Sequence, residues 1–153
     1  MIIYSFKSKV GTVTLLSKNN KIIKIILKTE ETYQDAPDEA CLLAEKQILE
    51  YFDNLRTEFT FPVKIEGSLF MKSVIETMMK IPYGETWSYS KLAEKSGNEK
   101  AVRAVGTACK NNPLPLIAPC HRVIKKTGDI GNFNGGVDLK KYLLNIEKKP
   151  SKN

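Results

Sequence analysis

One cysteine and the only histidine of the chain stand side by side in the stretch Pro119-Cys120-His121-Arg122. A thiol attacks only as its thiolate, and a neighbouring base or cation lowers the pKa of a thiol. Cys120 is therefore a candidate nucleophile and His121 a candidate base. In a regular strand the two side chains would point to opposite faces, so they would couple only through a turn or a bridging water. The alternative is that Cys120 is an ordinary buried cysteine without a catalytic role, and that it lies beside the histidine by chance.

A base of this kind needs an acid that orients its imidazole ring. That acid must come from elsewhere in the sequence, and Glu147 is available. The other two cysteines, Cys41 and Cys109, form no C-x-x-C pair, and an odd total of three does not predict a disulfide framework. The cysteines and the histidine lack the spacing of a zinc finger, so we expect no metal site.

Two loops must position the reactive pair. Residues 112–119 contain three prolines and predict a stiff, extended segment that leads into Cys120. Residues 131–136 form a glycine-rich loop, which lacks the strand–helix pattern and the spacing of a phosphate or dinucleotide site. The sequence therefore predicts no cofactor. A last helix is expected from about Asp138, as its cap, to Glu147.

Three further helices are expected before these loops. Ser68 can cap a helix that runs to about Lys80, and Ser88 can cap a short helix that ends at Gly97. A third helix is expected over 99–110. The last two form a candidate helix-turn-helix, a pair that proteins without DNA also contain.

The helix expected over 99–110 is rich in small residues and carries one arginine, Arg103. Readers of the major groove need several long polar side chains, so this composition favours shape-driven contact with the minor groove and little sequence preference. The alternative is close packing of one helix on another.

The first third of the chain indicates a separate β-rich part. Residues 10–16 and 22–27 are β-branched runs around a turn at 18–20, which predicts a hairpin. A helix then begins near Pro37 and Asp38, and its buried face is predicted from a three- and four-residue repeat of Cys41, Ala44, Ile48, Phe52 and Leu55. A boundary is expected within 57–67.

Composition limits the class of protein. The chain has 153 residues, and its 42% of apolar residues are enough for a core and too many for a disordered chain. Its apolar runs are much shorter than the roughly 20 residues of a membrane span, and its start lacks the pattern of a signal peptide. We therefore expect a protein inside the cell. The net charge of +7 suits a polyanionic partner, although most of the basic residues are lysines, which are usual on any solvated surface.

Several segments together resemble one known family. The segment Ile117-Ala118-Pro119-Cys120-His121-Arg122-Val123 is similar to the active-site motif of the 6-O-methylguanine-DNA methyltransferase family. Further motifs follow the family's order and spacing, namely 84–89 (GETWSY), 101–106 (AVRAVG), 112–113 (NP), 131–136 (GNFNGG) and 143–147 (LLNIE). The resemblance covers about residues 68–147. The first 67 residues resemble the variable N-terminal part of the family only in size and in their strand-rich start.

The resemblance implies an α+β protein with two domains. Residues 1–67 would form a ribonuclease-H-like α/β domain, and residues 68–153 a winged helix-turn-helix domain that holds the site. The implied reaction is the single, irreversible transfer of an alkyl group from 6-O-alkylguanine in DNA, with 4-O-methylthymine as an additional candidate substrate, to Cys120. His121 would act through a water, Glu147 would orient His121, and Asn112 would brace the turn before the active site.

The resemblance also implies how the substrate is held. Tyr89 would donate to the guanine ring, and Arg103 would fill the space of the flipped nucleotide. Ala101, Ala104 and Tyr89 would contact the minor groove of double-stranded DNA with little sequence preference, and the guanine edge would meet Val123, Phe133 and Asn134. The protein would be a monomer of the cytoplasm, or of the nucleus in a eukaryote. Two departures from the family pattern are Met71 and Asn134, the second of which narrows the expected pocket.

Two other functions compete with this interpretation. An alkyltransferase-like protein would bind the lesion without removing the alkyl group, but such proteins lack the cysteine that stands here at position 120. A cysteine hydrolase or redox enzyme would use Cys120 and His121, but would need neither a helix-turn-helix nor Arg103.

Overall fold

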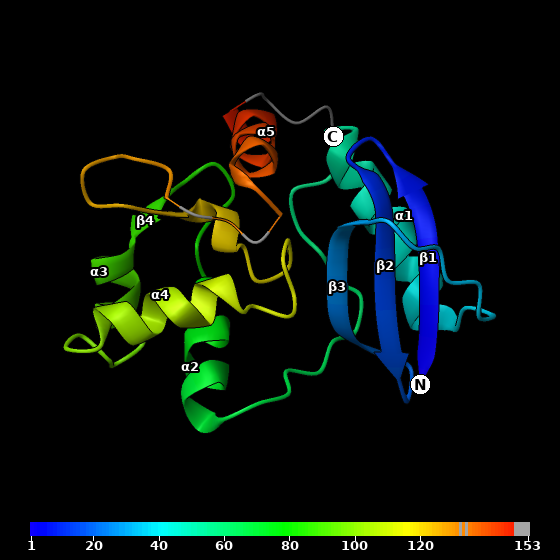
Figure 1. The fold of residues 1–153 in the computed structure, drawn as a ribbon, viewed down its shortest axis with the longest axis horizontal. Coiled ribbons are helices and arrows are strands. Elements are labelled where there is room, and N and C mark those ends of the chain that lie inside the picture. The colour runs from blue at the N-terminus through cyan, green and yellow to red at the C-terminus, as the bar shows by residue number, and fades with distance from the viewer. Residues whose placement is uncertain (132, 134, 149–153) are drawn as a thin grey trace. The chain divides into compact units, whose positions relative to one another are not determined.

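The computed structural model describes residues 1–131, 133 and 135–148. Contacts within the chain divide these residues into two compact units, Met1–Ile65 and Glu66–Lys148 (Figure 1). None of the helices in the described part is long and apolar enough to cross a membrane.

An antiparallel sheet of three strands forms the first unit, in the order β1 (Ile2–Ser8), β2 (Gly11–Lys18) and β3 (Lys21–Thr29). The predicted hairpin is confirmed by the pairing of β2 with β3. Asn19 and Asn20 join these strands with φ values of 53° and 58°, the left-handed conformation that a tight two-residue hairpin turn requires. Strand β1 was not predicted, because its residues are mostly half-buried and show no clean alternation of apolar and polar side chains.

Helix α1 (Glu39–Phe52) packs against all three strands. Its predicted start is confirmed, since a side-chain oxygen of Asp38 accepts a 2.9 Å hydrogen bond from the backbone N–H of Cys41. Four of the five residues predicted for its buried face are buried, and Leu55 is not, with 39% of its surface exposed. The helix ends before Leu55, at Phe52, and Asn54 turns the chain away with a φ of 61°.

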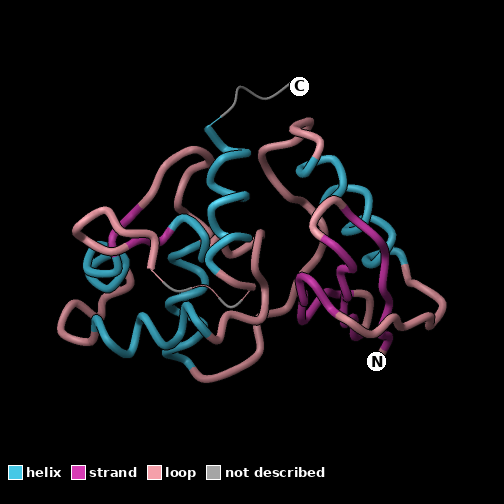
Figure 2. Tube along the Cα trace, turned by 45° about the horizontal axis from the view of Figure 1, so that its top comes forward, coloured by secondary structure: helices cyan, strands magenta, loops and turns pink. Residues whose placement is uncertain are grey.

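Helices and loops make up most of the second unit (Figure 2). Its helices are α2 (Leu69–Met78), α3 (Tyr89–Lys95), α4 (Val102–Lys110) and α5 (Val137–Lys148), and α2, α3 and α4 pack on one another. The core between the elements of this unit is apolar, with residues such as Val74, Met78, Leu92, Val105, Leu114 and Leu143 fully buried. This core is the scaffold on which the loop 112–119 rests.

The helix starts follow the expected capping chemistry only in part. Ser68 and Ser88 each accept a backbone N–H from the first turn of the next helix, as predicted. Helix α4 begins at Val102 and not near Glu99, because residues before it form a turn in which the N–H of Ala101 bonds the carbonyl of Asn98. Asp138 lies inside the first turn of α5 and does not precede it as a cap.

A short parallel strand pair ties two distant parts of the second unit together. Strand β4 (Trp87–Ser88) pairs with β5 (Val123–Ile124), so the segment just before α3 lies beside the segment just after Cys120. The sequence did not predict these strands, since two residues are too few to show a period. This pairing places Tyr89, the first residue of α3, next to the reactive segment.

The cap of α1 provides a test of the first unit. Asp38 also accepts a 2.5 Å hydrogen bond from the hydroxyl of Ser17, whose side chain is fully buried. Asp38→Ala should lower the free energy of unfolding by about 1–3 kcal/mol, because it removes the cap and leaves a buried hydroxyl without its acceptor. Circular dichroism during thermal and urea unfolding measures the loss. Glu39→Gln, one residue along on the exposed side, should stay within about 0.5 kcal/mol of the parent, and an equal loss in both variants would refute the capping role.

Candidate active site

The reactive segment is a turn of 3-10 helix, η1 (Cys120–Arg122), and not a strand. The N–H of Arg122 bonds the carbonyl of Pro119 at 2.9 Å, and the N–H of Cys120 bonds the carbonyl of Ala118 at 2.8 Å. This turn replaces the strict alternation of a strand, which would have sent Cys120 and His121 to opposite faces. Both side chains are buried.

Asn112 closes the loop that leads into this turn. Its side-chain N–H donates to the carbonyl of Ala118 at 2.8 Å, and its side-chain oxygen accepts from the N–H of Leu114 at 3.0 Å. Both ends of the amide are therefore used, and Asn112 itself is buried. The position of Cys120, two residues beyond Ala118, depends on these two bonds.

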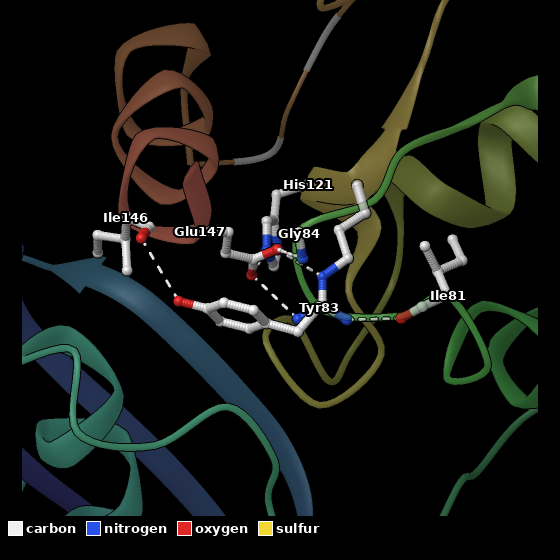
Figure 3. A network of polar contacts seen from close by, with 7 residues as sticks. Ile81, Tyr83, Gly84, His121, Ile146 and Glu147 are labelled. Atoms are coloured by element: carbon white, nitrogen blue, oxygen red, sulfur yellow. Dashed lines mark hydrogen bonds and ion pairs between the residues drawn. The ribbon is translucent and has the colours of Figure 1, made fainter. Parts of the chain in front are cut away.

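The carboxylate of Glu147 is the centre of a buried polar network (Figure 3). One oxygen lies 2.6 Å from Nε2 of His121, and the carboxylate also accepts two hydrogen bonds from Arg122, at 2.7 and 3.0 Å. The backbone N–H of Gly84 adds a contact of 3.3 Å. Burial acts to raise the pKa of Glu147, but the hydrogen bonds from His121 and Arg122 outweigh it and hold that pKa at about 2. Glu147 is therefore ionised at neutral pH.

Arg122 anchors this network to the rest of the unit. While Nε and one terminal nitrogen bind Glu147, the other terminal nitrogen donates to the carbonyl of Ile81 at 2.6 Å. The guanidinium also lies over the ring of Tyr83, 5.6 Å from its centre. The Tyr83 hydroxyl bonds the carbonyl of Ile146 at 3.4 Å (Figure 3). The planar guanidinium of arginine makes such a bidentate interaction with a carboxylate possible.

The same network sets the protonation of His121. Because an ionised carboxylate can only accept, Nε2 of His121 carries the hydrogen that points to Glu147. Burial lowers the pKa of His121 below its ordinary value of 6.5, although Glu147 acts against this. The ring is therefore neutral at pH 7, and its Nδ1 is the nitrogen that can take up a proton.

The thiol of Cys120 is held largely in its protonated form in the resting site. Burial raises the pKa of Cys120, while a hydrogen bond from the Asn112 side chain and the charge of Lys140 act to lower it. A base is therefore needed to generate the thiolate. Cys41 and Cys109 have pKa values of about 11 and 12, raised mainly by burial, so both remain thiols.

Tyr89 lies in the same neighbourhood, half-buried at the start of α3. Its ring lies between Gly106 of α4 and Gly131 of the glycine-rich loop, where an added Cβ would lie 3.8 Å from the ring and 3.3 Å from the phenol oxygen, respectively. Burial raises the pKa of Tyr89, and the nearby Cys109 and Cys120 raise it further. The phenol therefore keeps its hydrogen and can act as a donor.

The structure gathers only some of the residues that the sequence singled out. Cys120 and His121 lie in one turn, and His121 bonds Glu147, while Asn112, Tyr89 and Val123 lie close to them. On α4, by contrast, Arg103 and Ala104 are exposed, and Ala101 lies half-buried at its start. Phe133 is half-buried and its carbonyl accepts the N–H of Gly136. Asn134 lies outside the described residues. No group of three or more side chains suited to hold a metal occurs in the described part.

Sequence reasoning missed Lys140. Its side chain is completely buried, its ammonium donates to the carbonyl of Val123 at 2.7 Å, and it lies 5.9 Å from the centre of the Tyr89 ring. Burial lowers the pKa of Lys140 to about 8. A pattern could have found it, because Lys140, Leu143 and Glu147 recur at the spacing of one helix face. A charged residue in such an apolar stripe is expected to be buried.

Comparisons with known proteins agree on one family. A family model described as the DNA binding domain of 6-O-methylguanine DNA methyltransferase matches residues 69–149. The constitutive methylated-DNA--protein-cysteine methyltransferase of Bacillus subtilis is 37% identical over 93% of this chain and 92% of its own length.

Solved structures agree with this match. A crystal structure of Mycobacterium tuberculosis OGT in complex with DNA covers 99% of this chain and 96% of its own, at 33% identity and a TM-score of 0.88. An O6-methylguanine DNA methyltransferase from Methanococcus jannaschii, at 28% identity, covers 94% of this chain and 92% of its own with a TM-score of 0.70.

The network around Glu147 predicts a specific loss of stability in acid. A folded-state pKa of about 2, against an ordinary 4.5, means that Glu147 stabilises the fold fully above about pH 4.5 and ceases to do so as the pH falls toward 2. Glu147→Gln should therefore cost about 3 kcal/mol at pH 7, because Arg122 then stays buried without its counter-charge.

The difference between Glu147→Gln and the parent protein should shrink as the pH falls from about 4.5 toward 2, since the parent carboxylate becomes neutral too. Urea unfolding at several pH values measures it. The matched control is Glu94→Gln, whose exposed carboxylate should contribute little at any pH. A constant difference between Glu147→Gln and the parent across this range would contradict the pKa assignment.

Proposed function

This chain belongs to the 6-O-methylguanine DNA methyltransferase family, and we propose that it repairs DNA by moving an alkyl group from the 6-oxygen of guanine to Sγ of its own Cys120. The observation that carries the proposal is the position of Cys120 in one turn with His121, whose ring is held by the ionised Glu147. A lone buried cysteine would not need this buried charged network beside it. The presence of Cys120 also argues against a protein that only binds the lesion.

The proposed reaction starts with a proton transfer. His121 takes the thiol proton of Cys120 through a water, and the imidazolium that forms is stabilised by the adjacent Glu147. The side-chain amide of Asn112 donates to the sulfur and fixes its direction. The result is a thiolate, which is the strong, soft nucleophile that cleavage of an aryl-type ether requires.

The second step exchanges one bond to carbon for another. The thiolate forms a carbon–sulfur bond to the alkyl group, the carbon–oxygen bond breaks, and its electron pair goes to the guanine. Tyr89 donates a hydrogen bond or a proton to the guanine ring and so stabilises the leaving group. Backbone groups of Cys120, Val123 and the 133–134 loop hold the edge of the base. The products are guanine and S-alkylcysteine, and because a thioether has no carbonyl that water can attack, each molecule acts once.

Access to the base defines the DNA-binding part of the proposal. A thiol cannot reach a stacked base, so the nucleotide must be flipped out of the duplex. We assign residues 68–153 to a winged helix-turn-helix domain, in which α3 and α4 form the helix pair, and residues 1–67 to a ribonuclease-H-like domain. Arg103, exposed on α4, would fill the gap in the duplex, while Ala101 and Ala104 allow close approach to the minor groove.

The proposed chemistry favours a monomer, located in the compartment that contains the DNA. The reacting groups that we assign all come from one unit of one chain, so no second copy is needed to complete the site. We propose a monomer in the cytoplasm, or in the nucleus of a eukaryotic source, which binds duplex DNA with little sequence preference.

The nucleophile can be tested by mass. Cys120→Ser should abolish transfer from methylated duplex DNA and keep DNA binding, because a hydroxyl is a much weaker nucleophile and the contacts to DNA lie elsewhere. The intact mass of the parent protein should rise by one methylene unit, located on Cys120 by peptide mapping. Cys41→Ser, a buried thiol of the other unit, should transfer normally. Transfer by Cys120→Ser, or recovery of unmodified Cys120 after many repairs, would overturn the proposal.

The flipping role of Arg103 can be separated from chemistry by the choice of substrate. Arg103→Ala should slow repair of duplex DNA by roughly tenfold or more, since about 1.4 kcal/mol of lost compensation for unstacking already gives that factor. Reaction with the free alkylated base should hardly change, because that base needs no flipping. Arg56→Ala, which removes an arginine of the first unit that pairs with Glu50, is the control. Equal losses on both substrates would show that Arg103 has only a structural role.

A further inference from the structure

We propose that a groove on the outer face of α5 is a docking site for a partner protein, and that it binds an acidic peptide segment with apolar side chains beside its carboxylates. This inference goes beyond the proposed function, because it uses none of the groups that we assign to the transfer. We call this surface the α5 groove. It is defined by Ile124, Ile130, Lys141, Tyr142, Leu144 and Lys148.

The first observation is a hollow in the surface of the second unit. Side chains of β5, of the loop after it and of α5 enclose a space of about 680 Å³. A volume of this size is typical of ligand sites and can take a few apolar side chains. Among the described residues that line it, neither Cys120 nor Tyr89 occurs, so the hollow is separate from the reactive centre.

The lining of the groove is more apolar than the outer face of a helix requires. The buried side chains of α5 form one stripe, which consists of Leu139, Lys140, Leu143, Ile146 and Glu147. Tyr142 and Leu144 lie off this stripe, where helices usually carry polar residues, and Tyr142 is 38% exposed. A single exposed apolar side chain is ordinary, but these two share one hollow with Ile124 and Ile130. Apolar surface gathered in this way indicates a partner.

Both walls of the groove are fixed by contacts within the unit. On one side, the N–H of Lys125 donates to the carbonyl of Asp129, and the N–H of Gly128 donates to the carbonyl of Lys125, each at 2.8 Å. On the other side, α5 is anchored by the buried Leu139 and Leu143. A groove that is already formed needs little ordering when a peptide binds, which favours affinity.

The lysines at the rim determine the charge of the partner. Lys141 and Lys148 lie two helical turns apart on the same side of α5, separated by about 10 Å along its axis. Among the described residues, neither of them pairs with a carboxylate. Asp138 also lines the groove, but it belongs to the first turn of α5, where a negative charge suits the helix dipole. Carboxylates of a partner are therefore attracted to the edge formed by Lys141 and Lys148.

The combination of apolar walls and a basic rim favours a peptide over DNA. The DNA backbone offers phosphates, but no apolar side chain that could fill a hollow lined by Ile124 and Leu144. An acidic peptide with apolar anchors satisfies both features, as in other cases where such anchors enter a groove. The contacts to DNA that we propose come from Arg103, Ala101 and Ala104 at α4, so DNA and peptide would use different surfaces.

Fluorescence anisotropy with defined peptides measures the binding. The probe is a fluorescein-labelled peptide in which aspartates flank a leucine and a phenylalanine. Two control peptides have the same length, one with lysines in place of the aspartates and one with alanines in place of the apolar pair. The parent protein should bind the probe with a micromolar Kd, as is usual for small, transient interfaces. Each control peptide should bind at least about tenfold more weakly, because it lacks one of the two complementary features.

Two variants remove the same features from the protein. Lys141→Glu combined with Lys148→Glu reverses the charge of the rim, and Tyr142→Ala removes an aromatic wall. Each change should weaken binding of the probe by about tenfold or more, since like charges repel and aromatic anchors contribute strongly to interfaces. All variants should still transfer the methyl group of free 6-O-methylguanine to Cys120. A loss of transfer in the parent protein itself would instead count against the proposed function.

Matched controls lie on the first unit. Lys24→Glu combined with Lys46→Glu makes the same change of net charge at two exposed lysines. Tyr33→Ala removes a tyrosine that is 37% exposed, close to the value for Tyr142. Both controls should bind the probe like the parent protein, and melting curves first establish that every variant folds.

Each outcome supports or refutes the inference. Equal losses in the controls, or equal binding of the peptide with alanines, would show only a general attraction between a basic chain and acidic peptides. If reversal at Lys141 and Lys148 weakens binding to duplex DNA more than reversal at Lys24 and Lys46, the groove belongs to the DNA surface and the inference fails. A dimer in sedimentation velocity that Tyr142→Ala dissociates would assign the groove to a second copy of the chain and overturn the inference.

A measurement on the parent protein covers the case in which Tyr142→Ala does not fold. Addition of the probe should shift the backbone amide resonances of Ile124, Ile130 and Leu144 more than those of the first unit. Shifts that fall elsewhere would refute the α5 groove as the docking site.

Discussion

The buried ion pair between Glu147 and Arg122 is the interaction on which the site depends. One carboxylate from α5 receives the guanidinium and the imidazole of η1 and a backbone N–H from the loop before β4. Charges this deeply buried are tolerated only as a complete set, because each partner left alone would be an uncompensated charge. The network therefore fixes three segments relative to one another, and with them the orientation of His121.

A second constraint joins the reactive centre to the helix that we assign to DNA. The ring of Tyr89 lies beside α4, where a Cβ added at Gly106 would come within 3.8 Å of it, and on the same helix Arg103 is exposed. A residue that would fill the gap left by a flipped nucleotide and the residue that would donate to its base are thus linked through one turn of α4. In the function that we propose, recognition and chemistry share one rigid element, which favours accurate placement of the base.

The success of sequence reasoning differed between parts of the chain for physical reasons. The hairpin, the caps at Asp38, Ser68 and Ser88 and the pairing of Glu147 with His121 followed from local rules or from a motif. The two-residue strands β4 and β5 could not be found, because their stability comes from a partner 36 residues away and not from local propensity. The start of α4 was placed too early, since a turn at Asn98 captures the residues before it. Leu55 was predicted to be buried because the periodic pattern continues beyond the point where the backbone turns.

Lys140 shows the limit of a motif. Motif comparison identifies residues whose chemistry is already associated with a reaction. A single lysine is not identified in this way, because the chain contains many lysines. Only its position on the apolar face of α5 distinguishes it from exposed lysines such as Lys141. Burial is a property of the folded unit, so the burial of Lys140 could be recognised only from the structure.

The long loops that close the site have a consequence for how the protein is made. The bond between Gly84 and Glu147 spans 63 positions of the chain, and that between Arg122 and Ile81 spans 41. Contacts this far apart along the chain form late in folding, after local helices and turns. A chain still emerging from the ribosome ends before α5, so it has neither the carboxylate nor the buried ammonium group beside its thiol. The site is therefore complete only in the finished fold, and each molecule can carry out its single reaction only once α5 has packed against η1.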